Sequence, residues 1–313
     1  GPIVNDILPS VAQSSGPVSL RWLGTEYCGW FTSLLGMDRA QSAEEFTTSM
    51  DGWLVPTFSV VFAEENGNIG YQSAGQIPLR RSEKRGYRPG WDPDHQWIGL
   101  IPRDGMPGFQ NPDRGWITSA NNRAAPEDFP YPLYGRWSSG HRARRIRQMF
   151  EARETLTQQD MVDMQQDVTS IRATECVPKL VATLAKTTTP RISEALSYLS
   201  SWDYLMDTDR VGATIFDVFF THWQKTVVKE HFHNEEIASA IAGSSSGLAS
   251  TLLAGDEAGW FCNSNRVEAI KRAMNDALAE LEDRLGSNMA LWNWGRLHKI
   301  NLRHVLSDRG DLG

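Results

Sequence analysis

Helical periodicity is confined to one part of this 313-residue sequence, and this segregation restricts the fold more than any other feature. Residues 1–141 are rich in Gly, Pro and Trp and contain only short β-prone runs, whereas residues 142–286 carry most of the apolar spacing of three and four. Strands and helices in separate parts of one chain are typical of the α+β class. We therefore expect a β-rich part over 1–141, a helical domain over 142–286 and a return segment toward the core over 287–313.

Two short β-prone runs carry the clearest local prediction. Residues 58–63 and 68–72 are separated by Glu64-Glu65-Asn66-Gly67. Asn-Gly readily adopts the positive φ angles of a tight turn. We expect a β-hairpin over residues 58–72, within a larger sheet or at its edge.

A proline-rich stretch follows this hairpin. Six prolines occur between Ile77 and Ala120. Proline lacks a backbone N–H and has a fixed φ, so this density excludes long regular elements. We expect a loop path over a scaffold, and long ordered loops in compact domains are often functional.

The helical part contains recognisable helix starts and ends. Thr157 and Asn265 are predicted N-caps, Pro190 suits a first helical turn, and Gly286 suits a helix end. Ile215–Val228 is apolar on most faces, which predicts a central helix. The predicted apolar faces are Met161, Met164 and Val168 after Thr157; Ile192, Leu196 and Leu199 after Pro190; and Val267, Ile270, Met274, Leu278, Leu281 and Leu285 after Asn265.

The composition argues against several kinds of partner. The formal charge is −7 at pH 7 without the basic stripe that neutralises phosphates, so we expect no nucleic-acid partner. The most apolar stretch, Val211–Val228, is interrupted by Asp217, His222 and Gln224, so no membrane span is predicted. Three widely separated cysteines support neither a disulfide framework nor a CxxC metal site, and we expect no cofactor.

One polar segment directly after the proline-rich stretch is a candidate for chemistry. The apolar run that begins at Gly115 ends on Asn121, Asn122 and Arg123. A side-chain amide directed at a developing oxyanion stabilises the transition state, and loss of such a donor lowers the rate roughly 10²- to 10³-fold. An Asn-Asn pair at a strand end is also common turn chemistry, so the pair alone does not decide between the two interpretations.

Several short motifs occur in an order that resembles a known enzyme family. No single motif is specific, but the ordered set resembles the large subunit of penicillin acylases and of related acyl-homoserine-lactone and cephalosporin acylases, which are N-terminal nucleophile hydrolases. The resemblance spans nearly the whole chain. The motifs are Gly1 to Asn5, Asn66 to Tyr71, Gly90 to Asp92, Trp97 to Pro102, Asn111-Pro112, Thr118 to Arg123, Asp128 to Pro130, Arg142 to Ile146, Trp294 to His298 and Arg303-His304.

The resemblance implies part of an αββα N-terminal nucleophile hydrolase fold with a mainly helical insertion. It also implies an amide hydrolase that removes an acyl group from an amine such as a β-lactam or a homoserine lactone. Members use a Ser, Cys or Thr, exposed by self-cleavage as the first residue of the large subunit, with its own α-amine as the base. Asn121 matches the family's oxyanion asparagine, Arg142 the arginine that organises that site, and Phe58 a position that lines the acyl pocket.

The nucleophile itself is expected to lie outside this chain. Gly1 has no side-chain nucleophile, and the backbone nitrogens of Ser10 and Ser14 are not basic. We therefore expect this chain alone to hydrolyse no amide. Its expected partners are a small-molecule acyl amide and the remaining segments of the same precursor, namely the small subunit and the N-terminal part of the large subunit. The resemblance also implies a periplasmic or secreted protein.

Two positions depart from the family pattern, and one other motif invites a metal interpretation. Relatives commonly have Asn where this sequence has Ser59, which leaves the shape of the pocket open. A calcium-ligating aspartate of some members matches Leu133, which cannot ligate, so we expect no calcium site. His231 and His233 lie near two acidic residues, but no third ligand is recognisably spaced, so we interpret them as surface residues.

Two other functions remain open. The twelve tryptophans suit a non-catalytic binding or scaffold module of the same fold. A Gly-Ser, Gly-Cys or Gly-Thr junction upstream would favour the enzyme, and its absence would favour the module. A carbohydrate-active enzyme could use paired acids such as Asp92 and Asp94, although a chain with 38 acidic residues offers such pairs by chance.

Overall fold

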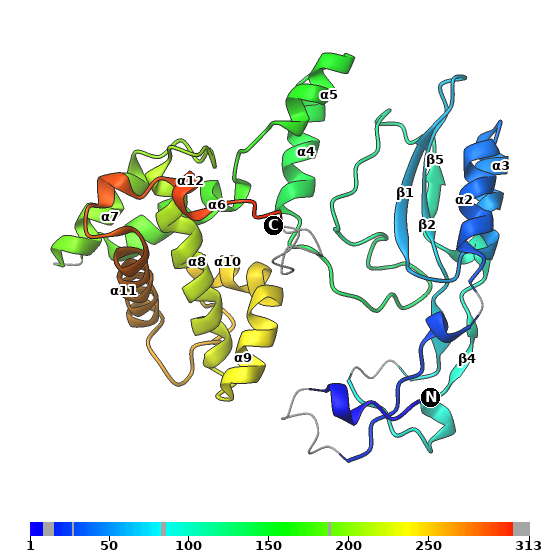
Figure 1. The fold of residues 1–313 in the computed structure, drawn as a ribbon, viewed down its shortest axis with the longest axis horizontal. Helices are drawn as coiled ribbons and strands as arrows, with labels where there is room; N and C mark the ends of the chain where they lie inside the picture. The colour runs from blue at the N-terminus through cyan, green and yellow to red at the C-terminus, as the bar shows by residue number, and fades with distance from the viewer. Residues whose placement is uncertain (9–15, 27, 83–85, 187–188, 303–313) are drawn as a thin grey trace, which may run out of the picture. The chain divides into compact units, whose positions relative to one another are not determined.

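The computed structural model describes residues 1–8, 16–26, 28–82, 86–186 and 189–302 (Figure 1). The chain forms two compact units, Gly1–Leu156 and Thr157–Gly313, so the division falls after residue 156 and not after the expected residue 141. Four residues singled out in the sequence, Ser10, Ser14, Arg303 and His304, lie outside the described residues.

The first unit is built on an antiparallel sheet of three strands in the order β1-β2-β5. The predicted hairpin is confirmed, with Val61 of β1 opposite Tyr71 of β2. Of the four turn residues, Gly67 alone has a positive φ, 86°, so Asn66 is not left-handed. β5 pairs with the other edge of β2, which makes β2 the central strand. The strands are β1 (Phe58–Ala63), β2 (Ile69–Ala74) and β5 (Gly108–Gln110).

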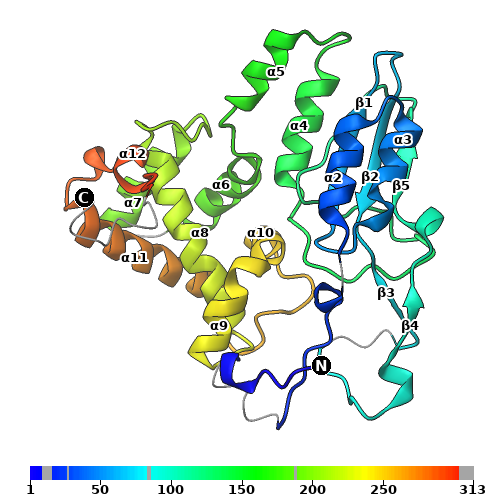
Figure 2. The same ribbon diagram turned by 45° about the vertical axis from the view of Figure 1, so that its right-hand side comes forward.

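Helices α2 (Trp30–Arg39) and α3 (Ala43–Thr48) lie on one side of this sheet (Figures 1 and 2). The Phe46 ring of α3 lies 5.2 Å from the ring of Phe62, and the Trp53 ring lies 5.5 Å from that of Phe58. Because side chains alternate along a strand, Val61 points to the opposite face, and 47% of its surface is exposed. The helical elements of this part are η1 (Asn5–Ile7), η2 (Leu23–Thr25), α2 (Trp30–Arg39), α3 (Ala43–Thr48) and η3 (Ser49–Gly52).

The proline-rich stretch contains only short regular elements in its described residues, as predicted. The longest is β4, with four residues. β3 and β4 pair with each other, whereas β5 joins the central sheet, a pairing that no sequence pattern predicts. Leu133 packs with Ile101 and Met106 in a small buried cluster, so it is a core side chain. The elements are β3 (Pro78–Arg80), η4 (Pro93–His95), β4 (Trp97–Leu100) and η5 (Arg103–Gly105).

Helix α4 (His141–Glu151) begins where the sequence places the helical part, but it belongs to the first unit. Its Phe150 ring stacks on Trp116 with 5.2 Å between ring centroids. Its Arg142 side chain donates a hydrogen bond to Asn121. These contacts join α4 to the loop that precedes it, so the boundary between the units falls after the helix.

The second unit is a set of helices packed around α8 (Val211–Lys229). α8 is buried on most faces, as predicted, and both Phe219 and Trp223 are fully buried. Met289 and Trp292 pack into this same core, so the described part of the expected return segment belongs to the helical unit. The other elements are α5 (Gln158–Gln165), α6 (Ile171–Leu184), α7 (Pro190–Ser200), α9 (Glu235–Ala242), η6 (Gly243–Ser245), α10 (Ser246–Ala254), α11 (Arg266–Leu285), η7 (Met289–Leu291) and α12 (Trp294–Leu297).

Local capping explains where these helices begin and end. Thr157 caps α5 in a capping box, and Pro190 occupies the first turn of α7. The Asn265 side chain accepts hydrogen bonds from the first backbone N–H groups of α11. Gly286 ends the same helix with a φ of 89°. All four predicted helix ends are confirmed.

Two predicted core positions are wrong. Val168 lies beyond the end of α5 and is 40% exposed. Val267 lies in the first turn of α11 and is also 40% exposed, because the buried stripe of that helix begins at Ala269 and Ile270.

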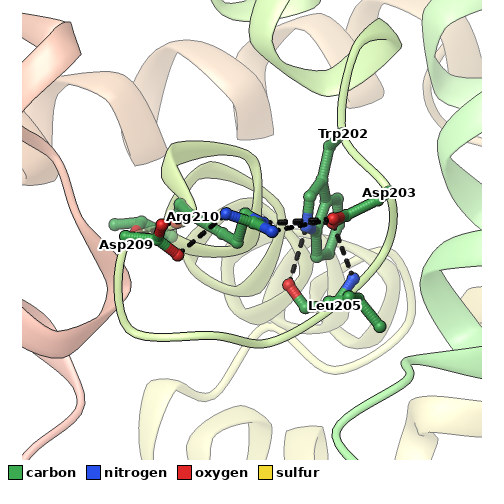
Figure 3. Close-up of polar contacts among 6 residues, drawn as sticks. Trp202, Asp203, Leu205, Asp209 and Arg210 are labelled. Atoms are coloured by element: carbon green, nitrogen blue, oxygen red, sulfur yellow. Dashed lines mark hydrogen bonds and ion pairs between the residues drawn. The ribbon is translucent and has the colours of Figure 1, made fainter.

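The connection between α7 and α8 is closed by Arg210, the N-cap residue of α8 (Figure 3). Its guanidinium donates to the Asp203 carboxylate at 3.0–3.3 Å and to the Asp209 carboxylate at 2.9 Å. The indole N–H of Trp202 donates to the carbonyl oxygen of Leu205 at 2.8 Å. Arg210 therefore links the beginning of this connection, at Asp203, to its end at the start of α8.

One helical stretch in the described part, Glu235–Ala254, is long and apolar enough to cross a membrane, with a mean hydropathy of 1.3. An apolar helix of a protein core meets the same criteria of length and composition. Ala249, Leu252 and Leu253 of this stretch are buried in the helical core. The stretch is therefore weak evidence for a membrane span.

Candidate functional site

The candidate site is a pocket of about 660 Å³ in the first unit, which we call the Asn121 pocket. One wall is the start of β1 with Phe58, a second is the segment 119–122, and a third is the segment 133–137. Arg142 of α4 completes it. The structure thus brings together all three residues that the family resemblance singled out, Phe58, Asn121 and Arg142.

Asn121 lies in a bend and not at the end of a strand. Residues 116–122 form no strand, and Asn121 has a positive φ of 59°, a conformation that asparagine tolerates better than most residues. Its carbonyl oxygen accepts a hydrogen bond from the backbone N–H of Ser138 at 2.7 Å. This bond fixes the bend against the opposite wall of the pocket.

Arg142 holds the side chain of Asn121. Its Nη2 donates to Asn121 Oδ1 at 2.7 Å, to the Ala120 carbonyl oxygen at 3.3 Å and to Ser138 Oγ at 3.4 Å. A cation in the first turn of a helix gains nothing from the helix dipole. The position of Arg142 in α4 is therefore explained by these three acceptors.

The contact with Arg142 also determines which way the Asn121 amide points. A guanidinium can only donate hydrogen bonds, so the amide oxygen must face it and the NH₂ group must face away. The Nδ2 atom of Asn121 makes no hydrogen bond with any residue that the structure describes. A fixed amide with an unused donor is the arrangement that oxyanion stabilisation requires.

Asn122 has a different role from its neighbour. Its Oδ1 accepts from the backbone N–H of Ala120 at 3.0 Å, and its Nδ2 donates to the carbonyl oxygen of Arg123 at 3.2 Å. These are the local bonds of a turn. The turn interpretation therefore fits Asn122, whereas Asn121 is the member with an unused amide donor, and the cation that contacts it is Arg142 and not Arg123.

Comparison with known proteins identifies the family. A sequence model of the penicillin amidase family matches residues 1–312. The chain belongs to the penicillin amidase family. It is 25% identical over 333 residues to the acyl-homoserine lactone acylase QuiP of Pseudomonas aeruginosa, which covers 95% of this chain and 39% of that protein. It is 26% identical over 288 residues to the penicillin acylase 2 proenzyme of Pseudomonas sp. (strain SE83). That match covers 88% of this chain and 36% of that protein.

The fold agrees with this family. The structure of the thermostable penicillin G acylase from Alcaligenes faecalis in its orthorhombic form superposes with a TM-score of 0.65 at 20% identity, covering 88% of this chain and 58% of that one. This likeness confirms the expected α+β fold class. The chain spans less than two fifths of the length of the relatives QuiP and penicillin acylase 2.

Phe58 stands at the rim of the Asn121 pocket in this member of the penicillin amidase family. Half of its surface is exposed, and its ring meets Trp53 edge to face at 5.5 Å. The neighbouring Ser59 is hydrogen-bonded to the Tyr71 hydroxyl at 3.0 Å. Burial raises the pKa of Tyr71, so this phenol stays neutral at physiological pH. The Ser59 hydroxyl is therefore held by a hydrogen bond to β2 of the sheet.

The pocket walls hold binding groups but no obvious base. Among the described residues that line it, Thr57, Ser59, Ser73, Ser119 and Tyr134 carry hydroxyls, while no Asp, Glu, His, Lys or Cys is present. No sequence motif marks Tyr134 and Trp137, which line the pocket from the segment 133–137. Their aromatic side chains are the only sequence feature that could have indicated a place in the pocket lining.

Proposed function

We propose that the intact protein hydrolyses amides by acyl transfer and that this chain supplies the oxyanion donor and one side of the acyl pocket. The observation that carries this proposal is the hydrogen bond of 2.7 Å between Arg142 and the Asn121 amide on the wall of a pocket. The membership of the penicillin amidase family supports the same activity.

Asn121 would act on the charge that develops during acyl transfer. Attack on an amide carbonyl moves a negative charge onto its oxygen, and a pre-oriented N–H group stabilises that charge more than it stabilises the neutral carbonyl. Arg142 keeps the Asn121 amide in position, and its positive charge polarises the amide further. Arg142 is thus a positioning residue in this proposal.

The nucleophile and the base would come from the rest of the intact protein. The absence of an ionisable base from the described walls of the Asn121 pocket supports this assignment. An N-terminal Ser, Cys or Thr combines both functions, because an α-amino group titrates near 7.7–8.0 and can accept the proton of the attacking group. Such a residue would be exposed by processing of a precursor, and the relative from Pseudomonas sp. (strain SE83) carries the name proenzyme.

The substrate would be a small acyl amide. Phe58 and Trp137 offer exposed apolar surface at the Asn121 pocket, which suits the acyl group. The names of the relatives mention acyl-homoserine lactones and penicillin, and both contain an acyl group on an amide nitrogen.

The test is amide hydrolysis by the intact protein and its variants. We expect Asn121→Ala to lower kcat roughly 10²- to 10³-fold with little change in thermal stability. Asn66→Ala, in the exposed hairpin turn, is the matched control and should retain the parental rate. An intact protein that hydrolyses no amide, together with an upstream sequence that lacks a Gly-Ser, Gly-Cys or Gly-Thr junction, would instead favour the non-catalytic module.

We also propose that the intact protein is periplasmic or secreted. The proposal rests on the family resemblance alone. Fractionation of cells that express the whole gene tests it, and recovery of the protein in the cytoplasmic fraction would contradict it.

A further inference from the structure

The side chain of Asn122 closes a hydrogen-bonded ring around the residue that precedes it. Its Oδ1 accepts from the backbone N–H of Ala120 at 3.0 Å, so this bond spans the whole backbone of Asn121. Both φ and ψ of Asn121 lie within the ring. A local bond from a side chain to the backbone restricts the torsion angles that it encloses. The restricted residue here is the proposed oxyanion donor.

A second bond fixes which way the Asn122 amide faces. Its Nδ2 donates to the carbonyl oxygen of Arg123 at 3.2 Å. The Ala120 N–H can only donate and the Arg123 carbonyl oxygen can only accept, so exchanging Oδ1 and Nδ2 would break both bonds. Both polar atoms of this side chain therefore bond inside the bend, as expected of a residue that shapes the backbone.

The backbone of Asn121 requires such a restraint. Its φ of 59° lies in the left-handed region, which is unfavourable for a residue with a Cβ and persists where the surrounding structure enforces it. Without the bond between Asn122 and Ala120, right-handed and extended conformations become accessible to Asn121. Either one redirects its Cα–Cβ bond, and with it the amide that meets Arg142 at 2.7 Å.

The other contacts of the bend act from outside it. The Ser138 N–H donates to the Asn121 carbonyl oxygen at 2.7 Å, and Arg142 donates to the Ala120 carbonyl oxygen at 3.3 Å. These bonds hold the bend against neighbouring segments. The ring at Asn122 instead controls the torsion angles within the bend, so it has a separate effect on the direction of the Asn121 side chain.

We propose that Asn122 is a positioning residue, which keeps Asn121 in the left-handed conformation from which its amide reaches the developing oxyanion. The inference rests on the proposed function, in which Asn121 is the oxyanion donor. Arg142 orients the amide group of Asn121, whereas Asn122 sets the backbone from which that group projects. Loss of the Asn122 side chain should therefore act on turnover through Asn121.

Kinetics of the intact protein test this path. The substrates are penicillin G and N-dodecanoyl-homoserine lactone. We expect Asn122→Ala to lower kcat about tenfold, which corresponds to about 1.4 kcal/mol, the contribution of a typical hydrogen bond. KM should change by less than about twofold, because no contact with the bound substrate is lost. Adding Asn122→Ala to Asn121→Ala should lower kcat no further, since no donor is left to position.

Asn111→Ala is the matched control. Asn111 also has a positive φ, 47°, and its side-chain oxygen accepts from the backbone N–H of Ile69 at 3.0 Å. It is not among the described residues that line the Asn121 pocket. Asn111→Ala should lower Tm as Asn122→Ala does, but it should keep the parental kcat. An equal fall in kcat for both variants, or a loss that adds fully to that of Asn121→Ala, would overturn the inference.

Crystal structures of the intact protein and its variants give a readout that needs no activity. In Asn122→Ala we expect Asn121 to leave the left-handed region and to lose its bond to Arg142. Asn122→Asp keeps the acceptor for the Ala120 N–H, so Asn121 should stay in place in this variant. Its rate is no guide, because an added negative charge opposes a nearby oxyanion.

The Asn122→Asp structure also tests the inference if Asn122→Ala does not fold. An unchanged Asn121 in Asn122→Ala, or a displaced Asn121 in Asn122→Asp, would overturn the positioning role. If the intact parent hydrolyses neither substrate but Asn121 moves in Asn122→Ala and stays in Asn122→Asp, the proposed function fails and the positioning of Asn121 by Asn122 stands.

Discussion

Arg142 donates a hydrogen bond of 2.7 Å to the side-chain oxygen of Asn121, which lies 21 residues earlier in the chain. Because the guanidinium cannot accept a hydrogen bond, this contact leaves the Asn121 NH₂ group as the donor that remains available. The orientation of one side chain thus depends on another that is held in the first turn of α4.

Replacement of Arg142 should therefore weaken catalysis through Asn121. Hydrogen bonds to charged groups contribute about 1.5–3 kcal/mol, which corresponds to a fall in kcat of about 10- to 100-fold for Arg142→Ala in the intact protein. We expect KM to change less than kcat, and Arg142→Lys to restore part of the rate. Steady-state kinetics with an acyl amide measure this. Combining Arg142→Ala with Asn121→Ala should add little to the loss from Asn121→Ala alone, and full additivity would contradict the positioning role.

Two substitutions in α11 should differ sharply in their effect on stability. Leu281 is fully buried, so Leu281→Ala removes apolar contacts and leaves a cavity, which should lower the free energy of unfolding by about 2–5 kcal/mol. Val267 on the same helix is 40% exposed, so Val267→Ala should change the free energy of unfolding by less than about 0.5 kcal/mol. Urea denaturation followed by far-UV circular dichroism compares them. Similar losses for both variants would mean that the burial pattern of α11 is wrong.

The Asp203–Arg210 pair predicts a pH-dependent contribution to stability (Figure 3). The hydrogen bond from Arg210 lowers the pKa of Asp203 in the folded state. A group with a lowered folded pKa stabilises the fold above its unfolded pKa, near 3.9, and this contribution is lost as the pH falls through the folded pKa. Asp203→Asn should therefore lower Tm at pH 7 and have a smaller effect near pH 3. An equal shift of Tm at both pH values would show that the charge of Asp203 does not contribute to stability.

The cysteines should differ in reactivity. Burial raises the pKa of the Cys176 thiol to about 11, and only 1% of its surface is exposed, so it is neither accessible nor ionised at pH 8. Cys262 is exposed. Brief treatment of the native chain with iodoacetamide at pH 8 should label Cys262 and leave Cys176 unmodified, as read by mass spectrometry of peptides. Unfolding in urea before treatment should make Cys176 reactive, and labelling of native Cys176 would contradict its burial.

Features that depend on neighbours in the chain were predictable from the sequence. The β1–β2 hairpin, the caps at Thr157 and Asn265, and the helix end at Gly286 all appear where the residues predict them. Each rests on backbone conformation or on hydrogen bonds between residues a few positions apart. The buried character of α8 was predictable for a similar reason, since a helix that is apolar on most faces has to be enclosed.

Features that depend on packing between distant segments were decided by the tertiary structure alone. The sequence pattern placed Val267 in the buried stripe of its helix, whereas packing leaves this side chain 40% exposed. The Asn121 amide acquires its direction from Arg142, and β5 finds its partner in β2. Local periodicity specifies which face of an element is apolar, but the neighbour that covers each position comes from elsewhere in the chain. The sequence by itself determined the hairpin, the helix caps and the helix end at Gly286, and only the contacts between elements decided which polar side chains meet at the candidate site.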